Sequence, residues 1–276
     1  MVETLAFATA SGEPVRGLLT RPSTPAGQLP AILYIHAHGN RYDIGAAELL
    51  DGRPALQSPL GPVLAAEGFV TLAIDLPCFG ARAGVSESAA AKAALWEGRS
   101  LAGQMLGELS SATGYLASRA DVDAKKIGAF GISMGATFGY WLAAVEPRIA
   151  SVIQLCCFAD LRTLIAAGAH DLHGIYLTVP GLLAVAGNGA IAGLVAPRPQ
   201  LICIGDRDPL TPPEAVDIAF AQALAAYAAA GAADNLVLHR EAETGHAESP
   251  AMRRAVLEFA ARHLRAPHSP SAEAGG

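Results

Sequence analysis

The alternation of short apolar runs with longer helical segments is the feature that most constrains the fold of this chain. The apolar runs lie at residues 31–36, 69–74, 126–130, 149–155, 200–204 and 236–240. Helical segments separate most of them, at residues 59–67, 87–119, 134–145, 213–230 and 249–264. Strands that are apolar on both faces and alternate with helices are typical of a mostly parallel sheet covered on both sides. The sequence therefore predicts an α/β fold with a mostly parallel central sheet flanked by helices.

The ends of the chain add to this plan. Residues 2–9 and 15–21 flank a Ser-Gly-Glu-Pro turn and predict an N-terminal antiparallel hairpin. We expect residues 1–265 to form a single domain, in which the extended connection 156–199 forms a pocket rim. Residues 266–276 are rich in Pro, Ser, Gly and Ala, and are expected to be a disordered tail. The two tryptophans, Trp96 and Trp141, are expected in the core.

Composition excludes several classes of protein. Among 276 residues, 52% are apolar and the net charge is −6, with no basic run that would indicate nucleic-acid binding. No stretch is long and apolar enough for a transmembrane helix, and no basic segment before an apolar run indicates a signal peptide. The four cysteines lie mostly in apolar contexts without a Cys-x-x-Cys pair, which favours buried thiols and a cytoplasmic location: Cys78, Cys156, Cys157 and Cys203. Nothing in the sequence fixes an oligomeric state.

The segment Gly131-Ile-Ser133-Met-Gly135 has the form G-x-S-x-G. It follows the predicted strand 126–130 and opens the predicted helix 134–145, which is the strand–turn–helix context of a nucleophilic serine. A tight turn of this kind projects the hydroxyl outward, and the helix N-terminus stabilises developing negative charge. The alternative is an ordinary Ser/Gly helix cap. We expect Ser133 to be the nucleophile.

A serine hydroxyl needs a base to take its proton, and the base needs an acid to orient it. His246 lies in a Thr-Gly-His turn after the last predicted strand and before the last predicted helix. The loop after strand 200–204 offers two acids, Asp206 and Asp208. The chain order serine, aspartate, histidine is that of α/β-hydrolases.

Two backbone N–H groups are needed to stabilise an oxyanion. One is expected from Met134, which follows the serine. The other is expected from the turn after strand 31–36, either from His38 or, if the register shifts, from Asn40.

The connection carries further polar side chains, His170, His173 and Tyr176, which are candidates for substrate contact at the pocket rim, and Asn40 in the turn after strand 31–36 is a fourth candidate. Two histidines three residues apart on a helix can also hold a metal. No third ligand is evident and Gly174 indicates a loop, so we expect neither a metal site nor a cofactor.

Together these segments resemble the α/β-hydrolase superfamily, in particular its dienelactone-hydrolase-like and acetyl-xylan-esterase-like branch, over residues 30–264. The stretches that carry the resemblance are His36–Arg41, Asp75–Arg82, the serine turn, Ala196–Pro199 and the Gly-His turn. In that family the acid lies four residues before a proline, which implies Asp208, before Pro212, rather than Asp206. Dienelactone hydrolases proper carry a cysteine nucleophile, so Ser133 favours an esterase.

The residues and the resemblance together predict a serine hydrolase of carboxylic esters that acts through an acyl-enzyme on small, short-acyl esters. A peptidase similar to the prolyl-oligopeptidase catalytic domain is one alternative, but 276 residues leave no room for that family's gating domain. A non-catalytic binding protein with a hydrolase fold is another, and the complete Ser/Asp/His set argues against it.

Overall fold

The structure, a computed structural model, describes residues 1–9, 11–24 and 27–265. Within these residues the strands form one sheet in the order β1-β2-β4-β3-β5-β6-β7-β8. Their bounds are β1 Val2–Ala8, β2 Pro14–Thr20, β3 Leu29–Ile35, β4 Val70–Ile74, β5 Val122–Ile132, β6 Ile149–Leu155, β7 Gln200–Gly205 and β8 Leu236–Glu241. The strands β3 to β8 are parallel, while β1 and β2 form an antiparallel hairpin that pairs with β4 at one edge. The predicted fold class is confirmed; the predicted tail lies outside the described residues.

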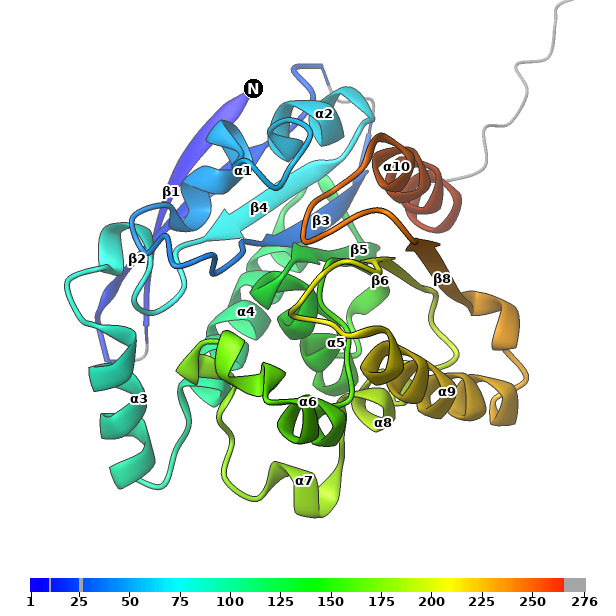
Figure 1. Cartoon of the computed structure of the whole chain (residues 1–276). Helices are drawn as coiled ribbons and strands as arrows, with labels where there is room; N and C mark the ends of the chain where they lie inside the picture. The colour runs from blue at the N-terminus through cyan, green and yellow to red at the C-terminus, as the bar shows by residue number, and fades with distance from the viewer. Residues whose placement is uncertain (10, 25–26, 266–276) are drawn as a thin grey trace, which may run out of the picture.

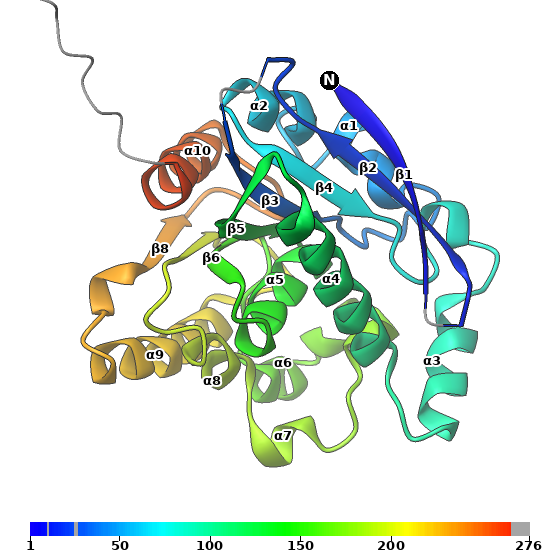
Figure 2. The same cartoon turned by 180° about the vertical axis from the view of Figure 1, so that it is seen from behind.

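Helices cover both faces of this sheet, as Figures 1 and 2 show from opposite sides. Their bounds are α1 Glu48–Asp51, α2 Leu60–Ala66, α3 Glu87–Trp96, α4 Leu101–Ser118, α5 Met134–Val145, α6 Leu161–Ala167, α7 Leu182–Val185, α8 Asn188–Gly193, α9 Pro213–Ala229 and α10 Pro250–Leu264. One face packs against α1, α2 and α10, through residues such as Leu49, Leu64 and Val256. The other packs against α4, α5, α8 and α9, through residues such as Met105, Phe138 and Val216. Because both faces are covered, all five residues of β4 are buried.

The alanine-rich region predicted as one helix over 87–119 is two helices in the structure. Gly98, with φ of +72°, ends the first, and Ser100 caps the second by accepting a hydrogen bond from the Gly103 amide. Trp96 ends α3 and is 90% exposed, so its expected place in the core is wrong. Trp141 is buried as expected and donates to Asn188 across 3.1 Å.

The carboxyl ends of the parallel strands determine where the predicted chemistry can gather. The turn 36–40 follows β3, Ser133 follows β5, the acid loop 206–212 follows β7, and the His246 loop follows β8. Parallel neighbours end at the same edge of a sheet, and ligands of open α/β sheets bind outside that edge. The connection 156–199 leaves the same edge after β6 and contains α6, α7 and α8 with two 3₁₀ turns between them.

Candidate active site

Ser133 occupies a strained turn between β5 and α5. Its φ is +57° and its ψ is −120°, a region that residues with a side chain rarely adopt. The Ser133 amide donates to the Leu155 carbonyl across 2.8 Å, which anchors the turn to the neighbouring strand β6. Strained backbone of this kind clusters at functional sites because the surrounding structure must hold it.

The glycines on either side of Ser133 are required by close packing. A Cβ on Gly135 would overlap the carbonyl oxygen of Ile35 at the end of β3, and a Cβ on Gly131 would overlap the carbonyl group of Gly135. The backbone of α5 can therefore reach β3 only when these positions lack side chains. This contact explains the G-x-S-x-G spacing in physical terms.

His246 and Asp208 form a hydrogen-bonded pair. The distance from His246 Nδ1 to Asp208 Oδ2 is 2.6 Å, and the Asp208 side chain is fully buried. The other carboxylate oxygen of Asp208 accepts the Leu210 amide across 2.9 Å. Because an ionised carboxylate only accepts, Nδ1 of His246 carries the proton and Nε2 is left with a free lone pair.

The structure brings Asp208, not Asp206, to His246. Asp206 forms ion pairs with Arg240 on β8 instead, and its side chain is 26% exposed. The loop that carries Asp208 and the loop that carries His246 are also joined through their backbones. The Arg207 amide donates to the Thr244 carbonyl across 2.9 Å.

Ser133 and His246 line one cavity of about 240 Å³. The remaining lining belongs to Ile132 and to the segments after β3, where Ala37, Gly39, Ile44, Pro54 and Ala55 are uncharged and Arg41 and Arg53 carry charge. A neighbouring hollow of about 520 Å³ shares four of these residues with the cavity: Arg41, Ile44, Arg53 and Pro54. Within the described part of the chain, the Ser133 hydroxyl forms no hydrogen bond to another side chain or to the backbone, so it is free to meet a ligand.

The amides predicted to hold an oxyanion differ in their partners. Neither the His38 amide nor the Met134 amide donates a hydrogen bond to any residue that the structure describes. The Asn40 amide donates to Nδ1 of His38 across 3.1 Å, and Asn40 has a φ of +54°. An amide without a partner is available to a ligand, so His38 and Met134 stay the predicted donors, although the described lining of the Ser133 cavity includes neither residue.

Two carboxylates that sequence reasoning did not single out hold the turn 36–40. Glu48 is fully buried, accepts the Ala37 amide and pairs with Arg53, whose Nη2 donates to the Ala37 carbonyl across 3.2 Å. The second carboxylate, Glu87, contacts His38 with Nε2 to Oε2 at 2.9 Å. Neither residue lies in a recognisable motif. The partners of Glu87 are distant in sequence, and those of Glu48 are nearer but stand in no pattern that marks a buried carboxylate.

The structure separates the three candidates of the connection. His173 is partly buried, and its Nε2 lies 3.1 Å from the carbonyl oxygen of Leu210 in the acid loop. Burial lowers the pKa of His173, so it is neutral at pH 7. Tyr176 is buried and packs against the His38 ring, with centroids 5.5 Å apart. His170 is exposed and is not brought to the site.

His36 is buried and neutral at the end of β3. Burial lowers its pKa to about 4. Its Nδ1 donates to the Ala37 carbonyl, and its Nε2 accepts the Leu76 amide across 3.4 Å. The side chain therefore links the turn after β3 to the end of β4 and is not available as a base.

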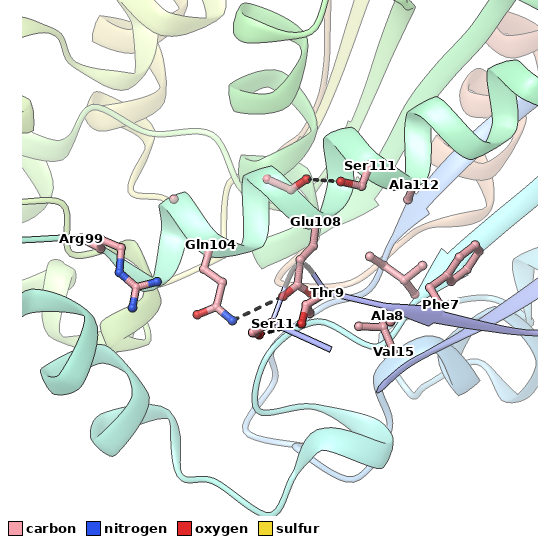
Figure 3. Close-up of a pocket in the computed structure, with 13 residues that line it drawn as sticks. Phe7, Ala8, Thr9, Ser11, Val15, Arg99, Gln104, Glu108, Ser111 and Ala112 are labelled. Atoms are coloured by element: carbon pink, nitrogen blue, oxygen red, sulfur yellow. Dashed lines mark hydrogen bonds between the residues drawn. The ribbon is translucent and has the colours of Figure 1, made fainter. Parts of the chain in front are cut away.

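The chain also has a larger cavity away from Ser133. It measures about 550 Å³ and lies between the β1–β2 hairpin and α4. Figure 3 shows Gln104 and Glu108 hydrogen-bonded along its wall. None of its described lining residues is a histidine; its charged side chains are those of Arg99 and Glu108.

Among residues 1–9, 11–24 and 27–265, no group of three or more His, Cys, Asp and Glu side chains is placed to hold a metal ion. No helix within these ranges is long and apolar enough to cross a membrane.

Comparison with known sequences gives two matches. A model of the dienelactone hydrolase family matches residues 56–159. The protein named "Putative hydrolase YtaP" of Bacillus subtilis (strain 168) is 37% identical over 265 residues, which are 96% of this chain and 88% of that protein.

Solved structures share the fold. The methylesterase BT1017 is 26% identical with a TM-score of 0.68, covering 95% of this chain and 54% of the methylesterase. This chain therefore spans about half the length of that protein. The acetyl xylan esterase from Paenibacillus sp. R4 is 19% identical with a TM-score of 0.70, covering 95% of this chain and 84% of the esterase.

Proposed function

The chain belongs to the dienelactone-hydrolase-like branch of the α/β-hydrolase superfamily, and on that premise we propose that it is a serine-dependent hydrolase of carboxylic esters. The observation that carries the proposal is the shared cavity, which is lined by Ser133, on a strained turn, and by a histidine that a buried aspartate orients. Esterases among the structural neighbours add support for ester rather than amide substrates.

In the acylation step, Ser133 attacks the ester carbonyl while His246 Nε2 takes its proton. The imidazolium that forms is stabilised by the Asp208 carboxylate at Nδ1. His246 then returns the proton to the leaving alcohol, and the acyl group stays on Ser133.

The oxyanion of the tetrahedral intermediate accepts hydrogen bonds from the amides of Met134 and His38. Because neither amide has a hydrogen-bond partner in the part of the chain that the structure describes, each can donate to the oxyanion without first breaking a bond. The Asn40 amide would first have to leave His38 Nδ1, which makes it the less suitable second donor.

In the deacylation step, His246 takes a proton from water as the water oxygen attacks the acyl carbonyl. The bond between the acyl carbon and Ser133 Oγ then breaks, His246 returns the proton to Ser133 Oγ, and the acid is released. No step in this scheme calls for a cofactor. We place the activity in a single domain of residues 1–265, and the four buried free thiols support a cytoplasmic location.

The triad is tested by substitution. Ser133→Ala and His246→Ala should each lower kcat for p-nitrophenyl acetate by on the order of 10⁴-fold or more, and the double variant should lose little further, because the residues act as a unit. A fluorophosphonate probe should label the wild type and not Ser133→Ala. Ser111→Ala, which changes a serine of the remote cavity, is the matched control and should behave as wild type. Near-normal turnover or labelling of Ser133→Ala would contradict the proposal.

A further inference from the structure

Three segments of the chain meet on one buried carboxylate beside the active site. Glu87 begins α3, and its side chain is 6% exposed. Its Oε2 accepts from His38 Nε2 across 2.9 Å and from the Tyr42 hydroxyl across 2.8 Å. Its Oε1 accepts the amide of Tyr176, in the connection, across 2.9 Å. We call Glu87 and these three donors the Glu87 cluster.

The Glu87 side chain is ionised in this cluster. Burial alone would raise its pKa, but the bonds from His38, Tyr42 and the Tyr176 amide hold the pKa below its ordinary value. An ionised carboxylate offers acceptors only, which suits three converging donors.

The cluster also fixes the His38 ring. Because Nδ1 accepts the Asn40 amide, Nε2 must carry the proton that is donated to Glu87. Tyr42, Phe79 and Tyr176 surround the ring with centroids 5.2, 5.3 and 5.5 Å away. A side chain bonded at both nitrogens and packed by aromatic rings has one orientation, and this orientation fixes the backbone amide of the same residue.

We propose that Glu87 is a positioning residue, which acts through His38 to hold the oxyanion-binding turn in its productive geometry. The inference rests on the proposed function, because it takes the His38 amide as an oxyanion donor. Glu87 itself touches neither the substrate nor the reacting atoms.

Gly174 provides independent evidence that this cluster has no spare room. A Cβ at Gly174 would lie 2.7 Å from His38 Nε2 and 2.9 Å from Glu87 Oε1. The backbone of Gly174 is ordinary, with φ of −67° and ψ of 157°, so an alanine there would strain the cluster and not its own backbone. The absence of a side chain at 174 lets the connection dock on Glu87.

The same short segment reaches the acid loop at its other end. His173 contacts the Leu210 carbonyl, and the Leu210 amide donates to Asp208. Residues 173–176 thus join the loop that holds the triad acid to the turn that holds the oxyanion donor. Weakening the contact between this segment and Glu87 should therefore reduce stabilisation of the transition state more than it reduces the affinity for substrate.

Glu87→Gln is the direct test. A glutamine has one acceptor oxygen and an NH₂ group, so in either orientation its NH₂ faces a donor, either His38 Nε2–H or the Tyr176 N–H. We expect kcat to fall by about 10- to 100-fold with KM within about twofold, because a misplaced donor weakens only the transition-state interaction. The inhibition constant of an alkyl boronic acid, which forms a tetrahedral adduct on serine, should rise in parallel.

Gly174→Ala should also lower kcat and raise the boronic-acid inhibition constant while KM stays nearly unchanged. It changes no ionisable group, so it tests the inference even if Glu87→Gln does not fold. Two controls are matched to the test. Gly187→Ala lies in the same connection and adds only an ordinary contact at 3.6 Å to Asp160. Glu108→Gln removes a carboxylate that pairs with Arg82, away from Ser133. Both controls should keep kcat and the boronic-acid affinity of the wild type.

The inference is overturned if Glu87→Gln and Gly174→Ala fold and keep kcat and boronic-acid affinity within about twofold of wild type. It is also overturned if the fall in kcat is no larger than the accompanying rise in KM, because the variants would then weaken substrate binding as much as the transition state. An inactive wild type would contradict the proposed function instead, so the two failures can be told apart.

Discussion

At the scale of single residues, Asp206 and Asp208 stand two positions apart in opposite surroundings. Asp208 is fully buried and bonded to His246, whereas Asp206 is partly exposed and paired with Arg240. Asp208→Asn should leave the fold intact but favour the wrong His246 tautomer, lowering kcat by on the order of 10⁴-fold. Asp206→Asn should keep kcat within about threefold, since it removes a partly exposed ion pair of small energetic value. Steady-state kinetics of both variants would decide, and a severe Asp206→Asn would show the assignment of the acid to be wrong.

His36 predicts a dependence of stability on pH. Its pKa is near 6.5 when unfolded and about 4 in the folded protein, so the unfolded chain binds more protons between these values. Its contribution to stability is fully present above pH 6.5 and is lost as pH falls toward 4, by up to about 3 kcal/mol. Urea unfolding of wild type and His36→Gln at pH 7.0 and 5.0 measures it. The variant should lose less stability between the two pH values, and equal losses would refute the assignment.

The identity of individual site residues could be predicted only where they follow strands. Ser133, Asp208 and His246 each lie just after a predicted strand, so their convergence follows from parallel topology. Glu48 and Glu87 could not be predicted, because Glu87 acts through segments far apart in sequence and Glu48 through a turn whose path no sequence pattern indicates. From sequence alone, a buried glutamate in a helix cannot be distinguished from a solvent-exposed one.

At the scale of elements, the contact between α5 and β3 decides whether the serine turn can form. Gly135→Ala should destabilise the protein by about 3 kcal/mol and abolish activity, because its methyl group would displace the end of β3. Gly139→Ala, one turn further along the same helix, meets only Val152 at 3.7 Å. It should be as active as wild type and up to about 1 kcal/mol more stable, because alanine favours a helix over glycine. Thermal melts and turnover numbers of both variants check this, and an active, stable Gly135→Ala would contradict it.

Elements with a strong apolar pattern were predicted closely, and elements set by local capping were not. The helix 134–145 and the strand 149–155 have the predicted bounds. The break between α3 and α4 was missed because alanine-rich sequence on both sides favours a helix equally. Its position depends on the Ser100 cap and the left-handed Gly98, which a propensity argument does not weigh. The exposed Trp96 follows from the same break, because it ends a helix that no longer continues along the core.

At the scale of the whole molecule, we expect the space around Ser133 to limit the size of the substrate. Each acyl methylene that fits should improve binding by roughly 0.8 kcal/mol, and the first that does not fit should cost more. A cavity of about 240 Å³ supports a preference for short acyl groups. We expect kcat/KM for p-nitrophenyl esters to peak between acetate and butyrate and to fall toward palmitate, with Ser133→Ala as the background control. A maximum at long chains, or activation by a lipid–water interface, would contradict this expectation.

The overall topology was predictable from the order of strands and helices, while the path of the connection 156–199 was not. That segment has little periodicity, and its 3₁₀ turns are held by contacts with α3 and the acid loop. His173 contacts the acid loop and Tyr176 contacts Glu87, whereas the described lining of the Ser133 cavity comes from other segments.

The burial of all four cysteines has a practical consequence for following that connection in solution. Burial raises the pKa of every one of these thiols, to about 11 for Cys78 and about 12 for Cys157, so none is a ready thiolate at neutral pH. Val185 in α7 is 88% exposed. A cysteine introduced there would be the one fast-reacting thiol, so a maleimide dye would label the connection selectively without removal of any native cysteine. Fluorescence from that single position would then report how the segment moves during turnover.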